Sequence, residues 1–257
     1  MLAEGYDVFL FDLDGVLYRS DQPIPGAAEA LARLRELGKR IAFVTNNSSR
    51  LPDEVSAKLL SVGVAAEPHE VVTSALVTAE LLADRGVRSV YVIGGVGLRS
   101  ELSAAGIELV DGDAAAVDAV VVGFDRGVDY ERLRVASVLV EKGASLVASN
   151  GDASFPASDG WNWPGAGALV AAIETTTGAR AEVVGKPHPP LLLAALDRAG
   201  GGVPLLVGDR IDTDIAGAAG LGWASALVLT GVTTRVQALQ AAPAPTYVLD
   251  DLLDLLA

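Results

Sequence analysis

Residues 7–16 read Asp7-Val8-Phe9-Leu10-Phe11-Asp12-Leu13-Asp14-Gly15-Val16, and they give the clearest indication of the fold. Its apolar part, residues 8–11, does not alternate with polar residues, which is typical of a parallel strand covered on both faces. Parallel α/β sheets bind ligands beyond the carboxyl ends of their strands. We therefore expect the two aspartates after this strand to lie at the functional edge of a sheet.

Similar short apolar runs recur along the chain, and an amphipathic stretch follows most of them. We expect strands at Val8–Phe11, Ile41–Thr45, Val90–Ile93, Ala119–Val122, Ser145–Ala148, Leu205–Val207 and Ala226–Leu229. We expect helices at Ala27–Leu37, Asp53–Val62, Ala75–Asp84, Tyr130–Glu141, Ala168–Thr175 and Leu191–Ala199. This alternation predicts an α/β fold with a parallel sheet and right-handed crossovers.

The composition excludes several classes of protein. With 257 residues, of which 51% are hydrophobic and 20% charged, the chain is neither disordered nor fibrous and is long enough for one large domain or two modest ones. Because it has no cysteine, disulfides, thiolate metal sites and a cysteine nucleophile are excluded. The formal net charge of −14 argues against a surface that binds nucleic acid or an anionic membrane.

The sequence predicts neither a targeting segment nor a membrane span. The first residues lack the basic and apolar regions of a signal peptide. Residues 215–234 carry no charge and have the length of a span, but they contain four glycines and divide into a short helix, a turn and a strand. We therefore expect a cytoplasmic protein without a membrane partner.

Three further polar segments lie beside predicted strands or helices. Thr45–Ser49 follows the second strand, and Lys186, one of only four lysines, lies between a glycine and a proline before a helix. Polar residues before a helix are commonly N-caps, and a single lysine is commonly a surface group. After a later strand, Asp209, Asp212 and Asp214 place three carboxylates within six positions. They repel one another unless a cation or hydrogen-bond donors compensate, so the segment favours a metal site.

Four of these motifs, in this order, resemble those of the haloacid dehalogenase-like phosphohydrolases. They are Asp12-x-Asp14-Gly-Val, Thr45-Asn46-Asn47, Gly-Lys186-Pro and Gly-Asp209-x-x-x-Thr-Asp214. The resemblance spans nearly the whole chain and is strongest to the nitrophenylphosphatase branch, which includes glycerol-3-phosphate, phosphoglycolate and pyridoxal phosphatases. It implies a Rossmann-like core at residues 1–81 and 182–257, with an inserted α/β cap domain at residues 82–181.

The resemblance also implies a role for each motif residue. Asp12 matches the nucleophile that forms an aspartyl-phosphate, and Asp14 matches the general acid and base. The expected Mg²⁺ ligands are the Asp12 carboxylate, the Asp14 backbone carbonyl and Asp209. Asp214 is expected next to these ligands without binding the metal directly.

The phosphoryl oxygens are expected to be held by Thr45, Asn46 and Lys186, with Asn47 in the same loop. A phosphate monoester dianion repels a carboxylate nucleophile, so a divalent cation and a lysine must neutralise charge before attack. The metal and the lysine that the resemblance implies supply this positive charge.

The cap is expected to select the substrate. Its Ser149–Gly165 segment is rich in turn-forming residues and carries Phe155, Trp161 and Trp163. The two tryptophans are expected to pack on their own domain, and Phe155 is the candidate substrate contact. In the pyridoxal phosphatase branch a His matches Phe155, so its replacement argues against pyridoxal phosphate as substrate.

The leading interpretation is a Mg²⁺-dependent phosphatase acting on a small phosphorylated metabolite, with glycerol 3-phosphate-like esters or nitrophenyl phosphate favoured. A phosphotransferase or mutase on the same core is the alternative among enzymes. A catalytically idle phospho-ligand binder or dimerising scaffold is the alternative outside them, and a homodimer through the cap is one expected assembly. The pairing of Asp12 with Asp14 argues against an idle binder, because a binder needs no acid/base beside a nucleophile.

Overall fold

The computed structural model describes residues 1–113, 115–156 and 161–257, and it divides into two compact units. The first unit comprises Met1–Thr45, Pro52–Val72 and Lys186–Ala257, and the second comprises Asn46–Leu51 and Thr73–Gly185. The cap range expected from the sequence, residues 82–181, falls inside the second unit. The limits of the cap as a domain stay a prediction.

The first unit is built on a parallel sheet with flanking helices. Its strands are β1 (Val8–Phe11), β2 (Tyr18–Arg19), β3 (Gln22–Pro23), β4 (Arg40–Thr45), β5 (Val71–Thr73, which ends at the unit boundary), β13 (Pro204–Gly208), β14 (Ala224–Val228) and β15 (Tyr247–Leu249). Its helices and helical turns are η1 (Leu2–Gly5), α1 (Ala27–Glu36), α2 (Pro52–Ser61), η2 (Pro68–Glu70), α7 (Pro189–Arg198), η3 (Ile211–Ile215), α8 (Ala216–Gly220), α9 (Arg235–Leu239) and η4 (Leu252–Leu256).

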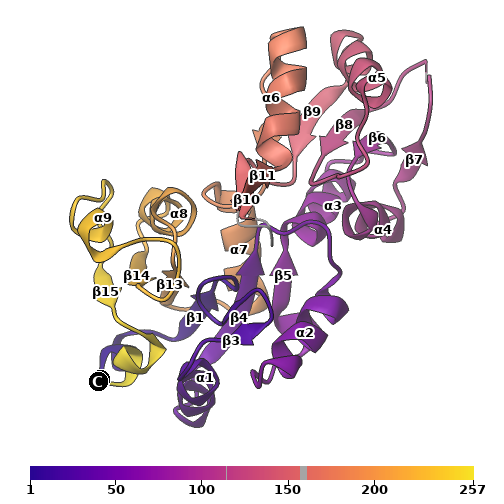
Figure 1. Ribbon diagram of the computed structural model, residues 1–257. Helices are drawn as coiled ribbons and strands as arrows, with labels where there is room; N and C mark the ends of the chain where they lie inside the picture. Colours follow the sequence, from indigo (N-terminus) through magenta and orange to yellow (C-terminus); the bar gives the residue numbers. More distant parts are fainter. Residues whose placement is uncertain (114, 157–160) are drawn as a thin grey trace. The chain divides into compact units, whose positions relative to one another are not determined.

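The strand order of this sheet is β15-β14-β13-β1-β4-β5 (Figure 1). Taken in chain order, this is the Rossmann arrangement, in which the direction of connection reverses between β1 and β13. The two strands pair in parallel, with Phe11 opposite Val207. Such a reversal point is where α/β sheets bind ligands, and Asp12 and Asp209 directly follow the two strands that flank it.

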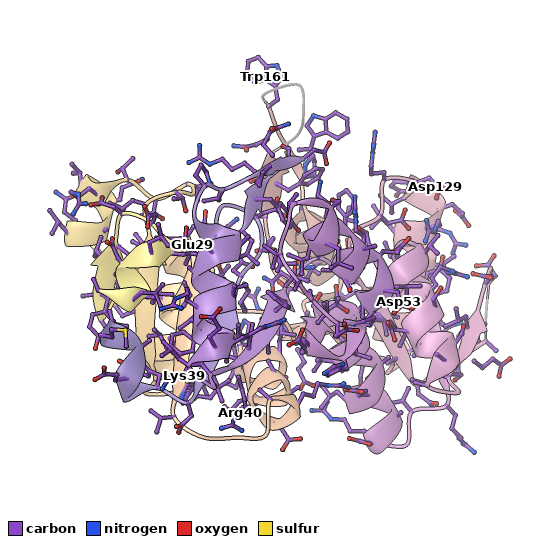
Figure 2. The ribbon with its side chains drawn as sticks, turned by 90° about the horizontal axis from the view of Figure 1, so that it is seen from below. Glu29, Lys39, Arg40, Asp53, Asp129 and Trp161 are labelled. Atoms are coloured by element: carbon purple, nitrogen blue, oxygen red, sulfur yellow. The ribbon has the colours of Figure 1, made fainter. Side chains whose placement is uncertain are left out.

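Large apolar side chains hold this sheet in place. Phe9, Phe11 and Phe43 are fully buried on one face, together with apolar residues of α1, α2 and η4. The opposite face of β4 and β1 is covered by α7. Each such phenylalanine contributes about 1.5–3 kcal/mol by its burial. Glu29 of α1 and Asp53 of α2, both labelled in Figure 2, are exposed polar residues of the covering helices.

The second unit is also a parallel sheet with helices. Its elements are α3 (Ser74–Asp84), β6 (Ser89–Ile93), α4 (Val96–Ala104), β7 (Glu108–Val110), β8 (Ala119–Val122), α5 (Tyr130–Glu141), β9 (Ser145–Ala148), β10 (Ser154–Pro156), β11 (Asn162–Pro164), α6 (Ala166–Thr177) and β12 (Glu182–Val183). The strand order is β12-β9-β8-β6-β7, and β10 and β11 form a separate antiparallel pair.

One face of the second sheet packs on α5 and α6. Ile93, Val122 and Ala148 of the sheet are buried there with Leu139 of α5 and Ile173 of α6. The predicted fold, an α/β protein with a Rossmann-like core and an inserted α/β domain, is therefore confirmed.

The uncharged stretch at residues 215–234 forms the end of η3, then α8, a turn and β14, as its glycines predict. None of the helices within the described residues is long and apolar enough to cross a membrane. Of the predicted Ser149–Gly165 segment, residues 157–160 lie outside the described part of the chain.

Candidate active site

Neighbouring strands of the first unit bring predicted site residues to one sheet edge. Asp12 follows β1, Asp209 follows β13, and Thr45 is the last residue of β4. The Asp12 N–H donates to the Val207 carbonyl oxygen at 2.9 Å, so the pairing of β1 with β13 continues up to the aspartate. The position of the Asp12 side chain is therefore set by the sheet itself.

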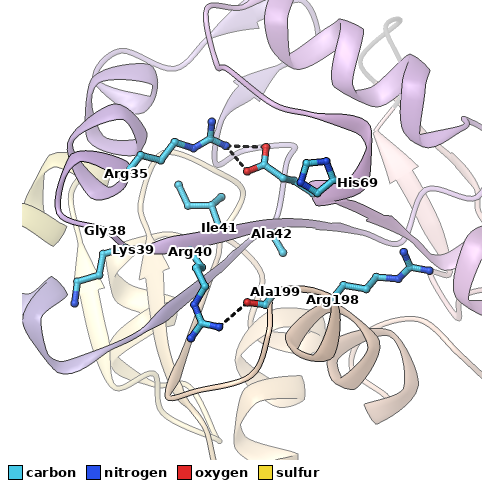
Figure 3. A pocket seen from close by; sticks show the side chains of 10 residues that line it. Arg35, Gly38, Lys39, Arg40, Ile41, Ala42, His69, Arg198 and Ala199 are labelled. Carbon is cyan, nitrogen blue, oxygen red and sulfur yellow. Dashed lines mark hydrogen bonds and ion pairs between the residues drawn. The ribbon is translucent and has the colours of Figure 1, made fainter.

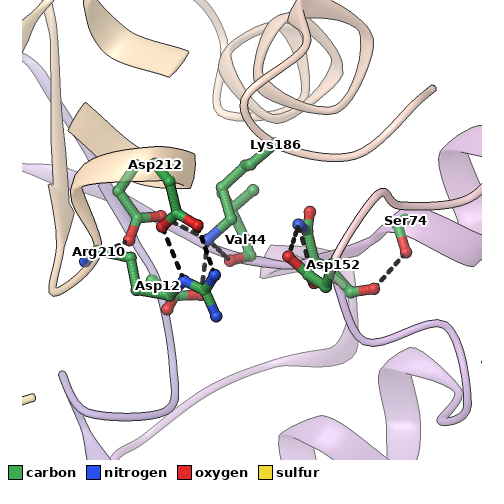
Figure 4. A network of polar contacts seen from close by, with 9 residues as sticks. Asp12, Val44, Ser74, Asp152, Lys186, Arg210 and Asp212 are labelled. Carbon is green, nitrogen blue, oxygen red and sulfur yellow. Dashed lines mark hydrogen bonds and ion pairs between the residues drawn. The ribbon is translucent and has the colours of Figure 1, made fainter. Parts of the chain in front are cut away.

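Lys186 lies between two carboxylates of this edge (Figure 4). Its Nζ is 2.6 Å from Oδ1 of Asp12 and 2.8 Å from Oδ1 of Asp214, and it donates to the Val44 carbonyl oxygen at 3.2 Å. Burial lowers the pKa of Lys186, but the charges of Asp12 and Asp214 outweigh burial and raise this pKa above its ordinary value. Lys186 is therefore a charged ammonium at neutral pH.

The carboxylates of Asp12, Asp209 and Asp214 form a cluster, in which one oxygen from each lies within 4.8 Å of the others. Burial, reinforced by the charges of Asp12 and Asp214, raises the pKa of Asp209 to about 7. Burial likewise raises the pKa of Asp214. Within the described residues, Lys186 is the only side chain that forms an ion pair with the cluster. When all three carboxylates are ionised, two negative charges are left without a counterion.

Asp209 provides the test of whether a cation fits there. Its Oδ2 accepts the Val232 N–H at 2.8 Å, whereas its buried Oδ1 has no hydrogen-bond partner among the described residues. Leaving a buried acceptor without a partner costs about 1–3 kcal/mol, and more when the group is charged. Oxygen ligands with excess negative charge are what a hard divalent cation requires. The residues present therefore fit Mg²⁺.

Two glycines shape the space around Asp209. Gly15 has a φ of +78°, and a Cβ at Gly15 or at Gly231 would collide with the Asp209 carboxylate. The Thr230 hydroxyl donates to the Gly15 carbonyl oxygen at 2.7 Å, which ties the turn after β1 to the loop after β14. The motifs did not identify this loop, because a Thr-Gly-Val sequence after a strand is typical of many turns.

The remaining aspartates of the motifs lie apart from the cluster. Asp14 is exposed on the turn after β1, and its carboxylate is not a member of the cluster found in the described residues. Asp212 accepts two hydrogen bonds from the Arg210 guanidinium, at 3.1 and 2.7 Å, and Arg210 holds the pKa of Asp212 below its usual value. Arg210 thus compensates the charge of Asp212. Of the three acids at positions 209–214, only Asp209 and Asp214 depend on another cation.

Asn46 and Asn47 belong to the second unit. Oδ1 of Asn47 accepts the Ser49 N–H at 2.9 Å and the Ser49 hydroxyl at 2.6 Å, which forms a turn closed by an asparagine side chain. Nδ2 of Asn46 donates towards the carboxylate of Asp152, at 3.2 Å from Oδ2 and 3.4 Å from Oδ1. Asp152 is thus a neighbour of the predicted phosphate loop that no motif assigned.

Phe155 lies in an aromatic cluster of the second unit. Its ring meets Phe124 edge to face, with centroids 4.8 Å apart, and its centroid lies 6.2 Å from that of Trp163. The Arg126 guanidinium lies 4.7 Å from the centroid of the Trp163 ring. Trp163 thus packs within its own unit, whereas Trp161 is 75% exposed (Figure 2).

A basic hollow of about 420 Å³ lies at the other end of the first sheet, at the start of β4 (Figure 3). Arg35 binds Glu70 through two hydrogen bonds of 2.8 Å, and Arg40 donates to the Ala199 carbonyl oxygen at 2.8 Å. Its lining includes the carboxyl ends of α1 and α7, where the helix dipole favours cations. The positive charge there has a structural explanation, and the clustered carboxylates are the better candidate site.

Comparison with known proteins identifies the family. A haloacid dehalogenase (HAD)-like hydrolase family model matches residues 9–108, and a second HAD-like hydrolase model matches residues 183–255. An acid sugar phosphatase of Staphylococcus saprophyticus is 38% identical over 97% of this chain and 96% of its own length.

Solved structures agree with this assignment. The glycerol phosphate phosphatase of Mycobacterium tuberculosis, in complex with magnesium, is 40% identical with a TM-score of 0.92, over 99% of this chain and 77% of that one. A p-nitrophenyl phosphatase from Archaeoglobus fulgidus is 36% identical with a TM-score of 0.90, over 97% of both chains. The predicted resemblance is confirmed: the chain belongs to the haloacid dehalogenase-like hydrolases and is one of their phosphatases.

Proposed function

We propose that this phosphatase hydrolyses small phosphate monoesters with the help of Mg²⁺, through an aspartyl-phosphate formed on Asp12. The observation that carries the proposal is the charge of the centre: Asp12, Asp209 and Asp214 face one another with only Lys186 as counterion in the described residues. Three carboxylates with a single ammonium group suit a centre that binds a dication together with a phosphate. The magnesium complex of the M. tuberculosis relative supports the choice of metal.

In the first half of the proposed reaction, a carboxylate oxygen of Asp12 attacks phosphorus. The bond between phosphorus and the ester oxygen breaks, and Asp14 gives its proton to the leaving alkoxide. Mg²⁺, when held by Asp12, the Asp14 carbonyl and Asp209, neutralises the repulsion between the phosphate and the attacking carboxylate. Lys186, Thr45 and Asn46 hold the phosphoryl oxygens in line for attack.

In the second half, Asp14 takes a proton from water, and the water oxygen attacks the phosphorus of the aspartyl-phosphate. The bond from phosphorus to Asp12 breaks, which regenerates both carboxyl groups and releases inorganic phosphate. The exposed position of Asp14, two residues after Asp12, suits a group that must exchange protons with both an alcohol and water.

We propose glycerol 3-phosphate-like esters and nitrophenyl phosphate as the favoured substrates. The glycerol phosphate and nitrophenyl phosphatases among the relatives support this choice. A small leaving group also requires little beyond the phosphate contacts of the core.

The test is a panel of phosphate esters, assayed for inorganic phosphate with Mg²⁺ and with a chelator. We expect phosphate release that depends on Mg²⁺ and is lost in Asp12→Asn. Transfer of the phosphoryl group to an added alcohol, followed by ³¹P NMR, would favour the phosphotransferase alternative. Absence of both products from every ester would favour an idle binder.

A further inference from the structure

The side chain of Asn46 is held by a carboxylate of its own unit. Its Nδ2 lies 3.2 Å from Oδ2 of Asp152, which is labelled in Figure 4. Thr45, the preceding residue, belongs to the first unit, so Asn46 stands where the chain passes from one unit to the other. The amide proposed to bind phosphate is thus fixed from the second unit.

The backbone of Asn46 is held independently of that contact. Its carbonyl oxygen accepts the Ser74 hydroxyl at 2.7 Å and Nδ2 of Asn150 at 2.8 Å. Ser74 is fully buried and Asn150 is 4% exposed, so both bonds are shielded from water. These bonds fix where the residue lies but do not decide which way its side-chain amide faces.

Asp152 decides the orientation of that amide. An ionised carboxylate only accepts hydrogen bonds, so it selects the NH₂ end of Asn46 and repels the carbonyl end. On the other side, Oδ1 of Asn46 faces Gly185, where an added Cβ would lie 2.6 Å from it. Gly185 directly precedes Lys186. Asp152 therefore turns the carbonyl end of the amide towards Gly185, and the proposed donor to a phosphoryl oxygen is the second N–H of Nδ2.

Asp152 is itself fixed by its backbone. Its N–H donates to Oδ1 of Asn150 at 3.2 Å, and its carbonyl oxygen accepts the Gly167 N–H at 2.9 Å. A carboxylate is a poor direct contact for a phosphate dianion, because the two charges repel. An effect of Asp152 on phosphate binding is better explained through the amide that it orients.

We infer that Asp152 is a positioning residue, which orients the Asn46 amide for the phosphoryl group of the substrate. The inference rests on the proposed function, in which Asn46 holds a phosphoryl oxygen. Since the amide meets the phosphate and not the alcohol, the effect of Asp152 must be the same for every ester.

Substitution of Asp152 tests this role. In Asp152→Ala, we expect the KM of nitrophenyl phosphate, the KM of glycerol 3-phosphate and the inhibition constant of inorganic phosphate to rise by one common factor of about ten, the scale of a charged hydrogen bond. Asp152→Asn keeps an acceptor but allows either amide orientation, and should raise the same constants less. Glu174→Ala is the matched control, because Glu174 binds Arg180 and the Ala181 N–H in the same unit without contacting Asn46.

A double-mutant cycle shows whether Asp152 acts through Asn46. In an Asn46→Ala background, Asp152→Ala should have no further effect on the inhibition constant of phosphate, because the amide to be oriented is gone. Additive effects, or a change confined to one ester, would overturn the inference. Thermal unfolding shows whether Asp152→Ala folds. If it does not, the same constants are measured in Asp152→Asn. Unchanged KM values and an unchanged inhibition constant of phosphate in that variant would overturn the inference.

Failure of this inference is distinct from failure of the proposed function. An active wild type with an inactive Asp12→Asn, but with unchanged constants in both Asp152 variants, refutes only the positioning role. A wild type that releases no phosphate from any ester refutes the function as well.

Discussion

The two units share an architecture and differ in the residues at the carboxyl ends of their strands. Both are parallel sheets with helices packed on them. In the first unit the strand ends carry Asp12, Thr45 and Asp209, whereas β6, β8 and β9 of the second unit are followed by Gly94, Gly123 and Ser149. The residues that directly follow the strands are thus charged at β1 and β13 of the first unit and uncharged at β6, β8 and β9 of the second.

In the second unit, packed side chains occupy the space beyond the ends of β6 and β8. A Cβ at Gly94 or at Gly123 would lie 2.8 Å from Cδ2 of Leu98, a buried side chain of α4. At Gly123 it would also lie 2.9 Å from Oγ of Ser149. The two sheets offer the same kind of edge, and the side chains at that edge determine what chemistry it can support.

The largest effect is expected from Asp12→Asn, which tests whether the chemistry lies in the first unit. The amide keeps the size of the side chain but cannot attack phosphorus, so the rate of phosphate release should fall by at least about 10⁴-fold, as for other nucleophiles. Activity is measured as phosphate release with Mg²⁺, and the fold by circular dichroism. Turnover within tenfold of wild type would remove Asp12 from the nucleophile role.

Asp14→Asn separates proton transfer from metal binding in the same unit. We expect kcat to fall by about 10²–10⁴-fold, since this is the contribution of a general acid or base. The rise in thermal stability on adding Mg²⁺ should persist, because the proposed ligand at this position is a backbone carbonyl. If Mg²⁺ no longer stabilised the variant while turnover was retained, the Asp14 carboxylate would be a metal ligand and not the general acid and base.

Gly231→Ala tests whether the space around Asp209 serves the metal. The new methyl group would collide with the Asp209 carboxylate, so the Mg²⁺ concentration for half-maximal activity should rise by about 10–100-fold, as for altered support of metal ligands. Gly220→Ala is the control, since a Cβ there meets nothing within 4 Å. Equal Mg²⁺ requirements in the two variants would show that the glycine is not needed for the metal.

The smallest effect is expected from Phe155→His in the second unit, where we expect selection without chemistry. The change should shift the relative kcat/KM of polyol phosphates by about tenfold, within the 1–3 kcal/mol that one pocket contact supplies. Nitrophenyl phosphate should change least, because its good leaving group depends little on such contacts. An unchanged ranking of esters would mean that Phe155, which packs on Phe124 and Trp163, is structural.

The buried strands could be predicted from the sequence, and the edge strands could not. Residues 8–11 and 119–122 are continuous apolar runs, and each forms a fully buried strand. At the sheet edges, β7 and β12 have three and two residues and are partly exposed, so their sequences carry neither a continuous apolar run nor a regular alternation. Their pairing partners, far away in the sequence, make them strands.

The acidic cluster could be predicted only in part. The order of the motifs identified Asp12, Lys186 and Asp209, which the fold places close together or on neighbouring strands. It could not show that Asp212 would pair with Arg210, because this depends on how the chain turns through η3. The bond between Asn46 and Asp152, which are 106 positions apart, likewise depends on tertiary structure.

The proposed nucleophile is tested most directly by locating the phosphoryl group during turnover. The enzyme is mixed with nitrophenyl phosphate and Mg²⁺, quenched in acid, reduced with borohydride, which converts an aspartyl-phosphate to homoserine, and digested for peptide mass spectrometry. We expect homoserine at position 12, dependent on both substrate and Mg²⁺. Homoserine at another aspartate, or an unmodified position 12 in an enzyme that turns over, would contradict it.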